Sequence, residues 1–210
     1  MIKILNEYFD KIYVITMKDS FRIPRMMERL KGVDYEFFIG CDGATLDKTP
    51  YIEMGSKQTR GQLGCTLSHH QLYKKIVSEG HEKVLILEDD CDISGPIDKL
   101  GEYISQLPED WGLFYLGWDG PNLLPNYSDN LCEVSRSFQK SLEGTHCIAI
   151  RPWFAKRLIE LNKSAHYTAD GLLTEVVKQY NLKTYAAIPK FGVQDGIESI
   201  TVNIDKEYGF

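Results

Sequence analysis

The stretch Lys83-Val-Leu-Ile-Leu87, followed at once by Glu88-Asp-Asp-Cys-Asp92, decides the fold. Four consecutive aliphatic residues without a polar interruption are typical of a strand that is buried on both faces. The abrupt change from Leu87 to Glu88 marks the carboxyl end of that strand. Working outward, shorter apolar runs predict further strands at residues 11–17, 35–39, 113–116, 147–150 and 183–188.

Segments with apolar residues near helical spacing separate these strands. They predict helices at residues 22–30, 66–78, 97–107, 153–161 and 172–179. In the first helix, Met26, Met27 and Leu30 are expected to face the core. The polar residues 44–60 and the Gly- and Pro-containing residues 118–131 predict loops. The alternation of strands and helices favours an α/β domain with a mostly parallel sheet that helices cover.

The composition is that of a globular chain. Its 210 residues are 43% hydrophobic and 26% charged, which is enough for one ordinary domain with a sizeable core. The formal net charge of −6 disfavours general nucleic-acid binding, which relies on positive charge against the phosphate backbone. It still allows a local basic pocket for one phosphorylated small molecule.

The cysteines and the first residues predict the compartment. The five cysteines are odd in number and show no C-x-x-C spacing, so neither a zinc knuckle nor a redox pair is indicated. Free thiols in a reducing compartment are the simplest interpretation. The first ten residues lack the apolar segment of a secretory signal, and no stretch reaches the roughly 18 apolar residues of a membrane span. We therefore expect no transmembrane segment and a cytoplasmic protein, either free or peripheral at a membrane surface.

Four carboxylates crowd the end of the central strand, at Glu88, Asp89, Asp90 and Asp92. Like charges this close raise one another's pKa unless a cation or strong donors offset them. Oxygen ligands suit a hard divalent cation. Because residues i and i+2 of an extended chain face the same way, Glu88 and Asp90, or Asp90 and Asp92, are placed to share one metal. A solvated acidic turn explains the same residues without a metal.

A second motif, Gly61-Gln-Leu-Gly-Cys-Thr-Leu-Ser-His69, precedes the acidic strand. Together with Glu88-Asp-Asp90, in this order and at this separation, it resembles glycosyltransferase family 25, which includes bacterial lipooligosaccharide galactosyltransferases and collagen β-galactosyltransferases. Thr16 stands where the family usually has asparagine, and Gln62 where it usually has glutamate. Further segments similar to the family pattern are Tyr13–Met17 with Arg22 and Arg25, Trp111–Gly117, Gly144–Ile150 with Ala155–Leu158, and Ala169–Leu173.

The resemblance implies a GT-A-like, Rossmann-type mixed sheet with helices on both faces. We expect a single glycosyltransferase domain over residues 1–210, with nucleotide-sugar binding mainly in residues 1–95 and acceptor binding mainly in residues 96–210. The implied reaction is an inverting, metal-dependent transfer of a hexose, most simply galactose, from a UDP-sugar to a saccharide or hydroxylysine acceptor, as in lipopolysaccharide biosynthesis. Mn²⁺ (or Mg²⁺) is the implied cofactor.

Two alternatives remain open. The first is a catalytically inactive domain that binds nucleotide sugars or serves as a scaffold in glycan assembly, which the two departures and the short chain motivate. The second is a nucleotidyltransferase or phosphohydrolase. Such enzymes also place carboxylates after a strand, but they have no counterpart of residues 61–69.

Candidate site residues follow from these motifs. Asp90 is the expected metal ligand, with Glu88 or Asp92 as a second ligand, although a solvated flank explains Asp92 better. Six residues are expected to bind the donor: Thr16, Arg22, Arg25, Ser68, His69 and Asp89. A buried threonine that bonds backbone explains Thr16 equally well. Ser68 and His69 are expected to open a helix, whose N-terminus favours anions, against the alternative of a structural histidine. Arg22 and Arg25 offer guanidinium groups for phosphate or ribose, against the alternative of surface arginines.

Asp170 is the candidate base that deprotonates the acceptor hydroxyl. An ordinary helix N-cap is the rival interpretation of this residue. Asp195 and Glu198 would close over the metal or donor, although a surface loop explains both. Cys65 is interpreted as a small buried filler, not a nucleophile. The remaining histidines are interpreted as surface or core residues: His70, His81, His146 and His166.

Overall fold

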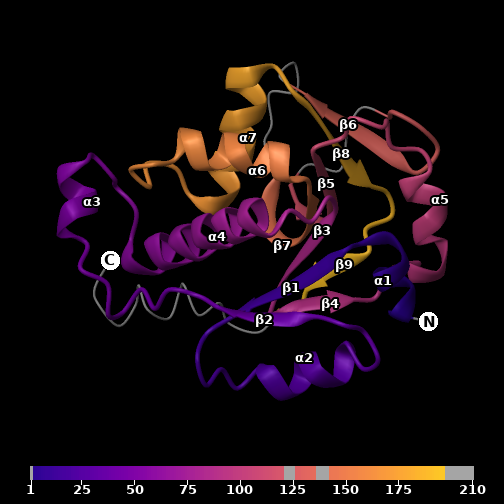
Figure 1. Cartoon of the computed structure of the whole chain (residues 1–210), viewed down its shortest axis with the longest axis horizontal. Helices are drawn as coiled ribbons and strands as arrows, with labels where there is room; N and C mark the ends of the chain where they lie inside the picture. The colour runs from indigo at the N-terminus through magenta and orange to yellow at the C-terminus, as the bar shows by residue number, and fades with distance from the viewer. Residues whose placement is uncertain (1, 121–125, 136–141, 197–210) are drawn as a thin grey trace.

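The computed structural model describes residues 2–120, 126–135 and 142–196 (Figure 1). Within these ranges a seven-stranded sheet has the order β2-β1-β3-β7-β5-β8-β6, and a separate two-stranded sheet pairs β4 with β9. The strands are β1 (Lys11–Thr16), β2 (Glu36–Ile39), β3 (Val84–Glu88), β4 (Cys91–Ile93), β5 (Leu113–Asp119), β6 (Leu131–Ser135), β7 (Glu143–Ile150), β8 (Lys183–Ala187) and β9 (Gly192–Gln194).

The large sheet is mixed. Its parallel pairs are β2 with β1, β1 with β3 and β5 with β8, while β7 runs antiparallel to both β3 and β5, and β6 runs antiparallel to β8. The mixed sheet is therefore confirmed, and the expectation of a mostly parallel sheet is wrong. A short buried apolar run has the same pattern in either direction, so the sequence did not reveal that β7 is reversed. This reversal brings the start of β7 beside the carboxyl ends of β3 and β5.

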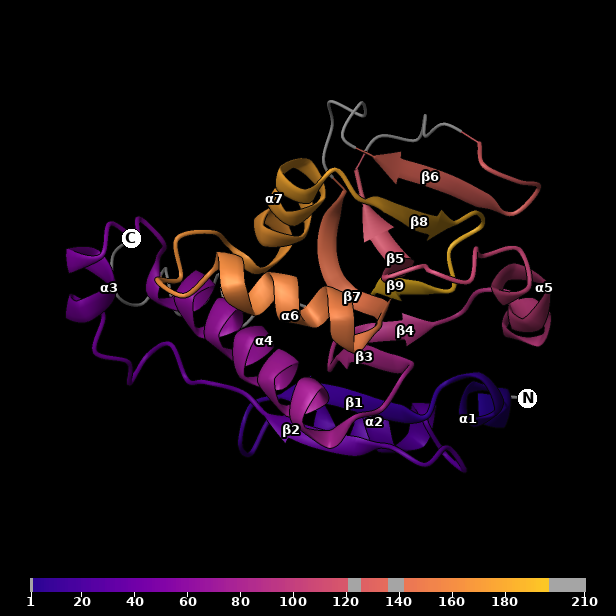
Figure 2. The same cartoon turned by 45° about the horizontal axis from the view of Figure 1, so that its top comes forward.

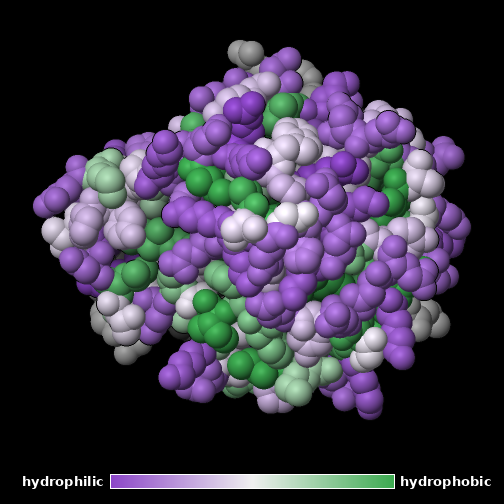
Figure 3. All heavy atoms as spheres, in the orientation of Figure 1, coloured by the Kyte–Doolittle hydropathy of each residue, from purple (hydrophilic) through white to green (hydrophobic). Residues whose placement is uncertain are grey.

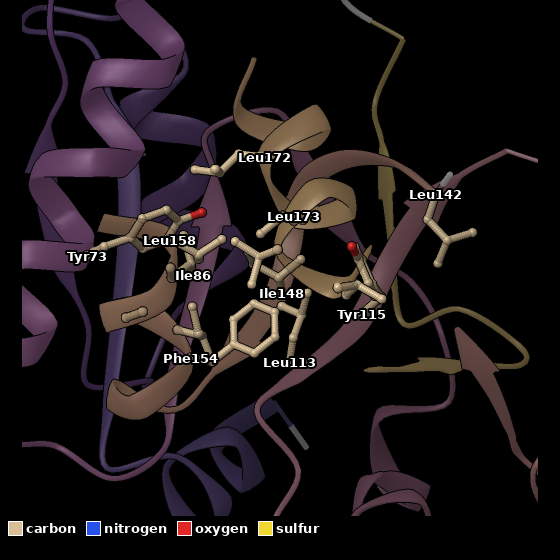
Figure 4. Packing of buried hydrophobic residues seen from close by; sticks show 14 of the residues in the cluster. Tyr73, Ile86, Leu113, Tyr115, Leu142, Ile148, Phe154, Leu158, Leu172 and Leu173 are labelled. Carbon is tan, nitrogen blue, oxygen red and sulfur yellow. The ribbon is translucent and has the colours of Figure 1, made fainter. Parts of the chain in front are cut away.

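Helices cover both faces of the sheet (Figures 1 and 2). The helices are α1 (Leu5–Tyr8), α2 (Ile23–Arg29), α3 (Thr49–Glu53), α4 (Arg60–Glu79), α5 (Leu100–Ile104), α6 (Pro152–Leu161) and α7 (Ala169–Tyr180), with 3₁₀ turns at Ile2–Ile4 and Ile97–Lys99. On one face α4, α6 and α7 supply residues such as Tyr73, Phe154 and Leu173 to a shared core (Figure 4). On the other face α1, α2 and α5 form a second core.

The position of β3 between the two cores explains why its sequence is apolar without interruption. Val84 and Ile86 belong to the core on one face, and Leu85 and Leu87 belong to the core on the other. All four side chains are fully buried. Both predictions made from this strand, that it lies inside the sheet and that it ends at Glu88, are therefore confirmed.

Helix α4 begins six residues earlier than the predicted helix at 66–78. Thr59 and Gln62 form a reciprocal capping box, in which each side chain accepts a hydrogen bond from the other residue's backbone N–H. Gly61 and Gly64 obscured this start, because glycine is a poor helix former. Gly64 allows close packing, because a Cβ at this position would lie 2.9 Å from the carbonyl oxygen of Cys41.

Other local predictions were wrong in part. Met27 is 56% exposed, whereas Met26 and Leu30, one helical turn apart, are buried. The predicted loop at 44–60 contains α3, and the predicted helix at 97–107 is a 3₁₀ turn followed by the short α5. At 118–131, β5 continues to Asp119 and β6 starts at Leu131, with residues 121–125 outside the described part.

Three further observations concern the surface, the length and polarity of the helices, and the cysteines. On the face drawn in Figure 3, hydrophilic residues cover most of the area and hydrophobic ones form small separate groups. Among the described residues, no helix has both the length and the apolar character that crossing a bilayer requires. All five cysteines are free, as predicted.

Candidate functional site

A pocket of about 540 Å³ opens beside the carboxyl ends of β1 and β3, against the N-terminal half of α4. Ligands of open α/β sheets bind outside this edge of the strands. Five of the predicted site residues line the pocket, together with Cys41 and Cys65: Thr16, Ser68, His69, Glu88 and Asp89. The structure therefore brings the two sequence motifs, which are about 20 residues apart, to the walls of one pocket.

Asp89 is the centre of a network in which both of its carboxylate oxygens accept hydrogen bonds. Its Oδ2 accepts hydrogen bonds from the hydroxyls of Thr16 at 2.6 Å and Ser20 at 2.9 Å. Its Oδ1 accepts one from Nη1 of Arg22 at 3.1 Å. The carboxylate is 5% exposed and Arg22 is 3% exposed. Three predicted donor-binding residues thus bond to one another and tie β1 and the start of α2 to the acidic motif.

Asp90 is buried to a similar degree, with 8% exposure, but it is poorly compensated. Its Oδ1 has no hydrogen-bond partner in the described part of the chain, and Nη1 of Arg22 lies 3.9 Å from its Oδ2. Burial, and then the charge of Glu88, raise the pKa of Asp90 to about 7, with Asp89 and Asp195 acting in the same direction. An orphaned, buried carboxylate oxygen among other carboxylates fits a hard divalent cation.

Glu88 makes its contacts on the other side of the acidic motif. Its Oε1 accepts a hydrogen bond from the hydroxyl of Thr145 at 2.5 Å and lies 2.9 Å from Nε2 of His69. Burial acts to raise the pKa of the Glu88 carboxyl, but His69, Thr145 and the charge of His146 together hold it below its ordinary value. Glu88 is therefore an ionised carboxylate next to the pocket.

The expected position of Ser68 and His69 at a helix start is wrong. Both residues lie in the interior of α4, which starts at Arg60. Their backbone N–H groups are consumed by the helix, so the argument from a helix N-terminus does not apply to them. The Ser68 hydroxyl donates to the carbonyl of Gly64 and accepts from the N–H of Cys41, which is a structural role. His69 is buried and faces Glu88.

Asp92 and Arg25 belong to an ion-pair network away from the pocket. Asp92 is 43% exposed and lies 3.5 Å from Nε of Arg29. Asp195 contacts both Arg25, at 2.9 Å, and Arg29, at 3.2 Å. Its backbone N–H also donates to the carbonyl oxygen of Asp90. This network joins the segment just after β9, which carries Asp195, to α2. Glu198, the other residue expected to close over the metal or donor, lies outside the described residues.

The three predicted metal ligands do not gather at one point. Among the described residues, the group of three His, Cys, Asp or Glu side chains with ligand atoms all within 4.8 Å of one another is Cys65, His69 and Glu88. Of the predicted carboxylates, Asp90 alone combines burial with an unpartnered oxygen.

Asp170 lies in the first turn of α7 and is not its N-cap. Thr168 is the N-cap, and its hydroxyl accepts a hydrogen bond from Gly171 N–H and donates to Asp170 Oδ1 at 2.8 Å. The charge of Asp170 contributes to the raised pKa values of Tyr115 and Cys65, although burial is the largest cause for both groups. Asp170 therefore lies near Tyr115 and Cys65, but it is not among the residues that line the pocket.

Sequence reasoning assigned no functional role to three residues of this region. Thr145 donates a hydrogen bond to Glu88. No local sequence pattern predicts this contact, because it depends on β7 running antiparallel to β3. The ring of His146 is fully buried beside Gly117 and Gly144, and neither of its nitrogens has a partner among the described residues. Cys65 lines the pocket instead of filling the core. Its spacing of four residues from His69 was the available signal.

Comparison with known proteins identifies the family of the chain. Residues 9–173 match the family model described as glycosyltransferase family 25 (LPS biosynthesis protein). The chain belongs to glycosyltransferase family 25. Human procollagen galactosyltransferase 2 is 29% identical over 217 aligned residues, which cover 86% of this chain and 34% of that protein. Human inactive glycosyltransferase 25 family member 3 is 28% identical over 132 residues, which cover 52% of this chain and 22% of that protein.

The chain thus spans about a third of the length of the human galactosyltransferase. Among solved structures, a glycosyltransferase involved in the glycosylation of the major capsid of PBCV-1 aligns with a TM-score of 0.47 and 11% identity, over 94% of this chain and 98% of that one. Family 25 contains relatives that are named as galactosyltransferases and relatives that are named as inactive. Family membership alone therefore does not tell whether this chain is active, and its activity has to be inferred from its own pocket residues.

Proposed function

We propose that this chain is an inverting, metal-dependent glycosyltransferase domain that transfers a hexose, most simply galactose, from a UDP-sugar. The observation that carries the proposal is the unpartnered Oδ1 of Asp90, buried among carboxylates beside the pocket. A protein that only needed a folded acidic turn would expose such a group or give it donors, because an uncompensated buried charge is costly. A divalent cation at Asp90 removes that cost.

Asp90 is the proposed ligand for Mn²⁺ (or Mg²⁺), which when bound supplies charge neutralisation for a departing diphosphate. Glu88 would assist at this ion as a second ligand or through water, since it is held as an ionised carboxylate two residues away. Asp92 takes no direct part, since it pairs with Arg29 at the surface.

The pocket is the proposed donor site, and Asp89 shapes its wall. By bonding Thr16 and Arg22, Asp89 holds the end of β1 rigid where the nucleotide binds. His69 presents a polar edge to the pocket through its contact with Glu88. Asp170 is the proposed base for the acceptor hydroxyl, because it is a carboxylate from a different element whose charge acts on Cys65 in the pocket wall.

The two halves of the chain divide these tasks. Residues 1–95 supply the donor-binding groups, and residues 96–210 supply Asp170 and the acceptor-binding surface. A saccharide, as in lipopolysaccharide, or a hydroxylysine of a protein is the proposed acceptor. The family description and the galactosyltransferase relatives support these two acceptor classes. The five free thiols support a reducing compartment such as the cytoplasm.

A panel of UDP-sugars tests this proposal, with UDP release as the readout. We expect release with Mn²⁺, loss of release in chelator, and a loss of at least about 100-fold in kcat for Asp90→Asn. Asp92→Asn is the matched control, because it removes a neighbouring carboxylate that points away, and it should retain activity. Full activity in chelator, or in Asp90→Asn, would exclude the metal-dependent mechanism.

A binding domain without catalytic activity is the second candidate. The engagement of Thr16 and Arg22 by Asp89 favours it, because it leaves these side chains fewer free donors for a ligand. The human relative named as inactive supports it as well. Calorimetry that shows UDP binding, combined with no UDP release from any donor and acceptor tested, would select this candidate.

A further inference from the structure

One wall of the pocket gathers a sulfur, a nitrogen and an oxygen atom. Cys65 and His69 lie four residues apart in α4, so their side chains project from the same face of the helix. Glu88 ends β3 opposite that face. The ligand atoms of the three side chains lie within 4.8 Å of one another, and all three residues line the pocket. Nothing in the proposed transfer reaction requires the sulfur.

We propose that Cys65, His69 and Glu88 form a binding site for a thiophilic divalent cation of the Zn²⁺ class. Zinc takes cysteine sulfur at about 2.3 Å, histidine nitrogen at about 2.0 Å and carboxylate oxygen at about 2.1 Å, in tetrahedral geometry. Ligand atoms that surround such an ion are therefore separated by roughly 3.3–3.8 Å. The three ligand atoms already lie within 4.8 Å of one another, so small side-chain movements would bring them to these separations. Because all three residues line the pocket, a fourth position on the ion would be open to it.

Neighbouring residues already orient the two ligands that flank the cysteine. The hydroxyl of Tyr73 lies 3.5 Å from Nδ1 of His69, which leaves Nε2 directed at Glu88. Thr145 holds the Glu88 carboxylate by a hydrogen bond to Oε1. Metal-binding histidines and carboxylates are typically held by outer partners of this kind.

The charges around Cys65 also favour a cation. After burial, the carboxylates of Glu88, Asp170 and Asp90 are what raise the pKa of the Cys65 thiol well above its ordinary value. The same negative potential that opposes a bare thiolate attracts a divalent ion. A thiolate and a carboxylate together neutralise the two positive charges of the ion, and a neutral imidazole completes the set.

This site differs in chemistry from the proposed site at Asp90. Asp90 offers oxygen and suits hard ions such as Mn²⁺ or Mg²⁺, whereas sulfur selects softer ions. Binding at Cys65 does not depend on whether the chain transfers a sugar. His69 and Glu88 have a proposed role in both sites, but the thiolate of Cys65 belongs to this one alone, so a readout of the metal–sulfur bond tests it separately.

Titration with Co²⁺, the spectroscopic substitute for zinc, tests the inference on the reduced full chain. We expect one equivalent of Co²⁺ to produce the ultraviolet thiolate-to-cobalt charge-transfer band and the intense visible bands of a tetrahedral ion, both removed by competing Zn²⁺. Cys65→Ser should abolish the charge-transfer band and weaken binding at least about tenfold. Cys41→Ser is the matched control, because Cys41 lines the same pocket but lies outside the group of three.

Asp90→Asn separates this site from the proposed catalytic one, since it should lose Mn²⁺-dependent turnover and keep the cobalt–thiolate band. Circular dichroism establishes that each variant is folded. The inference is overturned if the wild-type chain shows no thiolate band, a result that needs no variant. It is also overturned if the band survives in folded Cys65→Ser or disappears in folded Cys41→Ser.

Discussion

Asp89 and Asp90 are adjacent, carry the same side chain and are buried almost equally, yet their surroundings are opposite. Asp89 accepts three hydrogen bonds from Thr16, Ser20 and Arg22. Asp90 has an oxygen without a partner in the described residues and a pKa raised to about 7. Burial alone therefore does not mark a functional carboxylate. The informative property is whether the protein supplies donors for the charge that it buries.

The largest expected effect on stability comes from replacing Asp89, the carboxylate that accepts three hydrogen bonds. Asp89→Ala leaves Arg22 buried without its nearest carboxylate and removes the acceptor of two hydroxyls, so we expect a loss of about 3–5 kcal/mol in the free energy of unfolding. Urea denaturation at neutral pH measures it. Asp90→Ala is the control, and we expect it to cost far less. Equal losses for the two variants would erase the distinction between the residues.

Asp90, the carboxylate with an unpartnered oxygen, should make the free energy of unfolding depend on pH. Because the pKa of Asp90 is raised above that of the unfolded chain, its ionisation destabilises the native state fully above about pH 7 and not at all below about pH 4. We therefore expect Asp90→Asn to be more stable than the wild-type chain at pH 8, on the order of 2 kcal/mol, with the difference vanishing near pH 4.

Urea denaturation at several pH values provides this comparison. Added Mn²⁺ should shrink the difference at pH 8, because a bound cation compensates the Asp90 carboxylate in the wild-type chain alone. A difference that is constant from pH 4 to 8 would contradict the raised pKa.

The individual bonds to Asp89 offer a finer test. Thr16→Val keeps the shape of the side chain but removes the hydroxyl that donates at 2.6 Å, and we expect a loss of about 1–2 kcal/mol. Ser20→Ala removes the second donor, which is less buried, and should cost less. Thermal or urea unfolding ranks the two variants. If Ser20→Ala cost more than Thr16→Val, the hydrogen bond from the loop after β1 would stabilise Asp89 more than the bond from β1 itself.

The smallest effect is expected in the ion-pair network behind the motif. Arg25 and Arg29 both contact Asp195, but the Arg25 side chain is 46% exposed and that of Arg29 is 13% exposed. Solvent screens the exposed pair, so Arg25→Ala should cost less than about 1 kcal/mol. Arg29→Ala should cost more, because this side chain also donates to the carbonyl of Cys91. A larger loss for Arg25→Ala would indicate a role beyond this pairing.

Much of the fold was predictable, and the failures have identifiable causes. The predicted strands at 11–17, 113–116 and 183–188 match β1, β5 and β8 closely, because buried β-branched and aromatic runs are a local signal. The start of α4 was missed, although the capping box at Thr59 was present, and the first turns of this helix contain two glycines, which are poor helix formers. Gly64 is required by close contact with Cys41 and Gly43, and no local sequence pattern shows this contact.

The sequence by itself determined where the buried strands lie, where the acidic motif begins, and, through the order of its motifs, the family. These properties depend on runs of neighbouring residues. Only the tertiary structure decided that β7 is reversed, that Thr16, Ser20 and Arg22 bond Asp89 and leave Asp90 uncompensated, and that Cys65 and His69 meet Glu88. The physical reason is that partners of a buried charge are chosen by distance in space, and the chain brings them from segments up to about 70 residues apart.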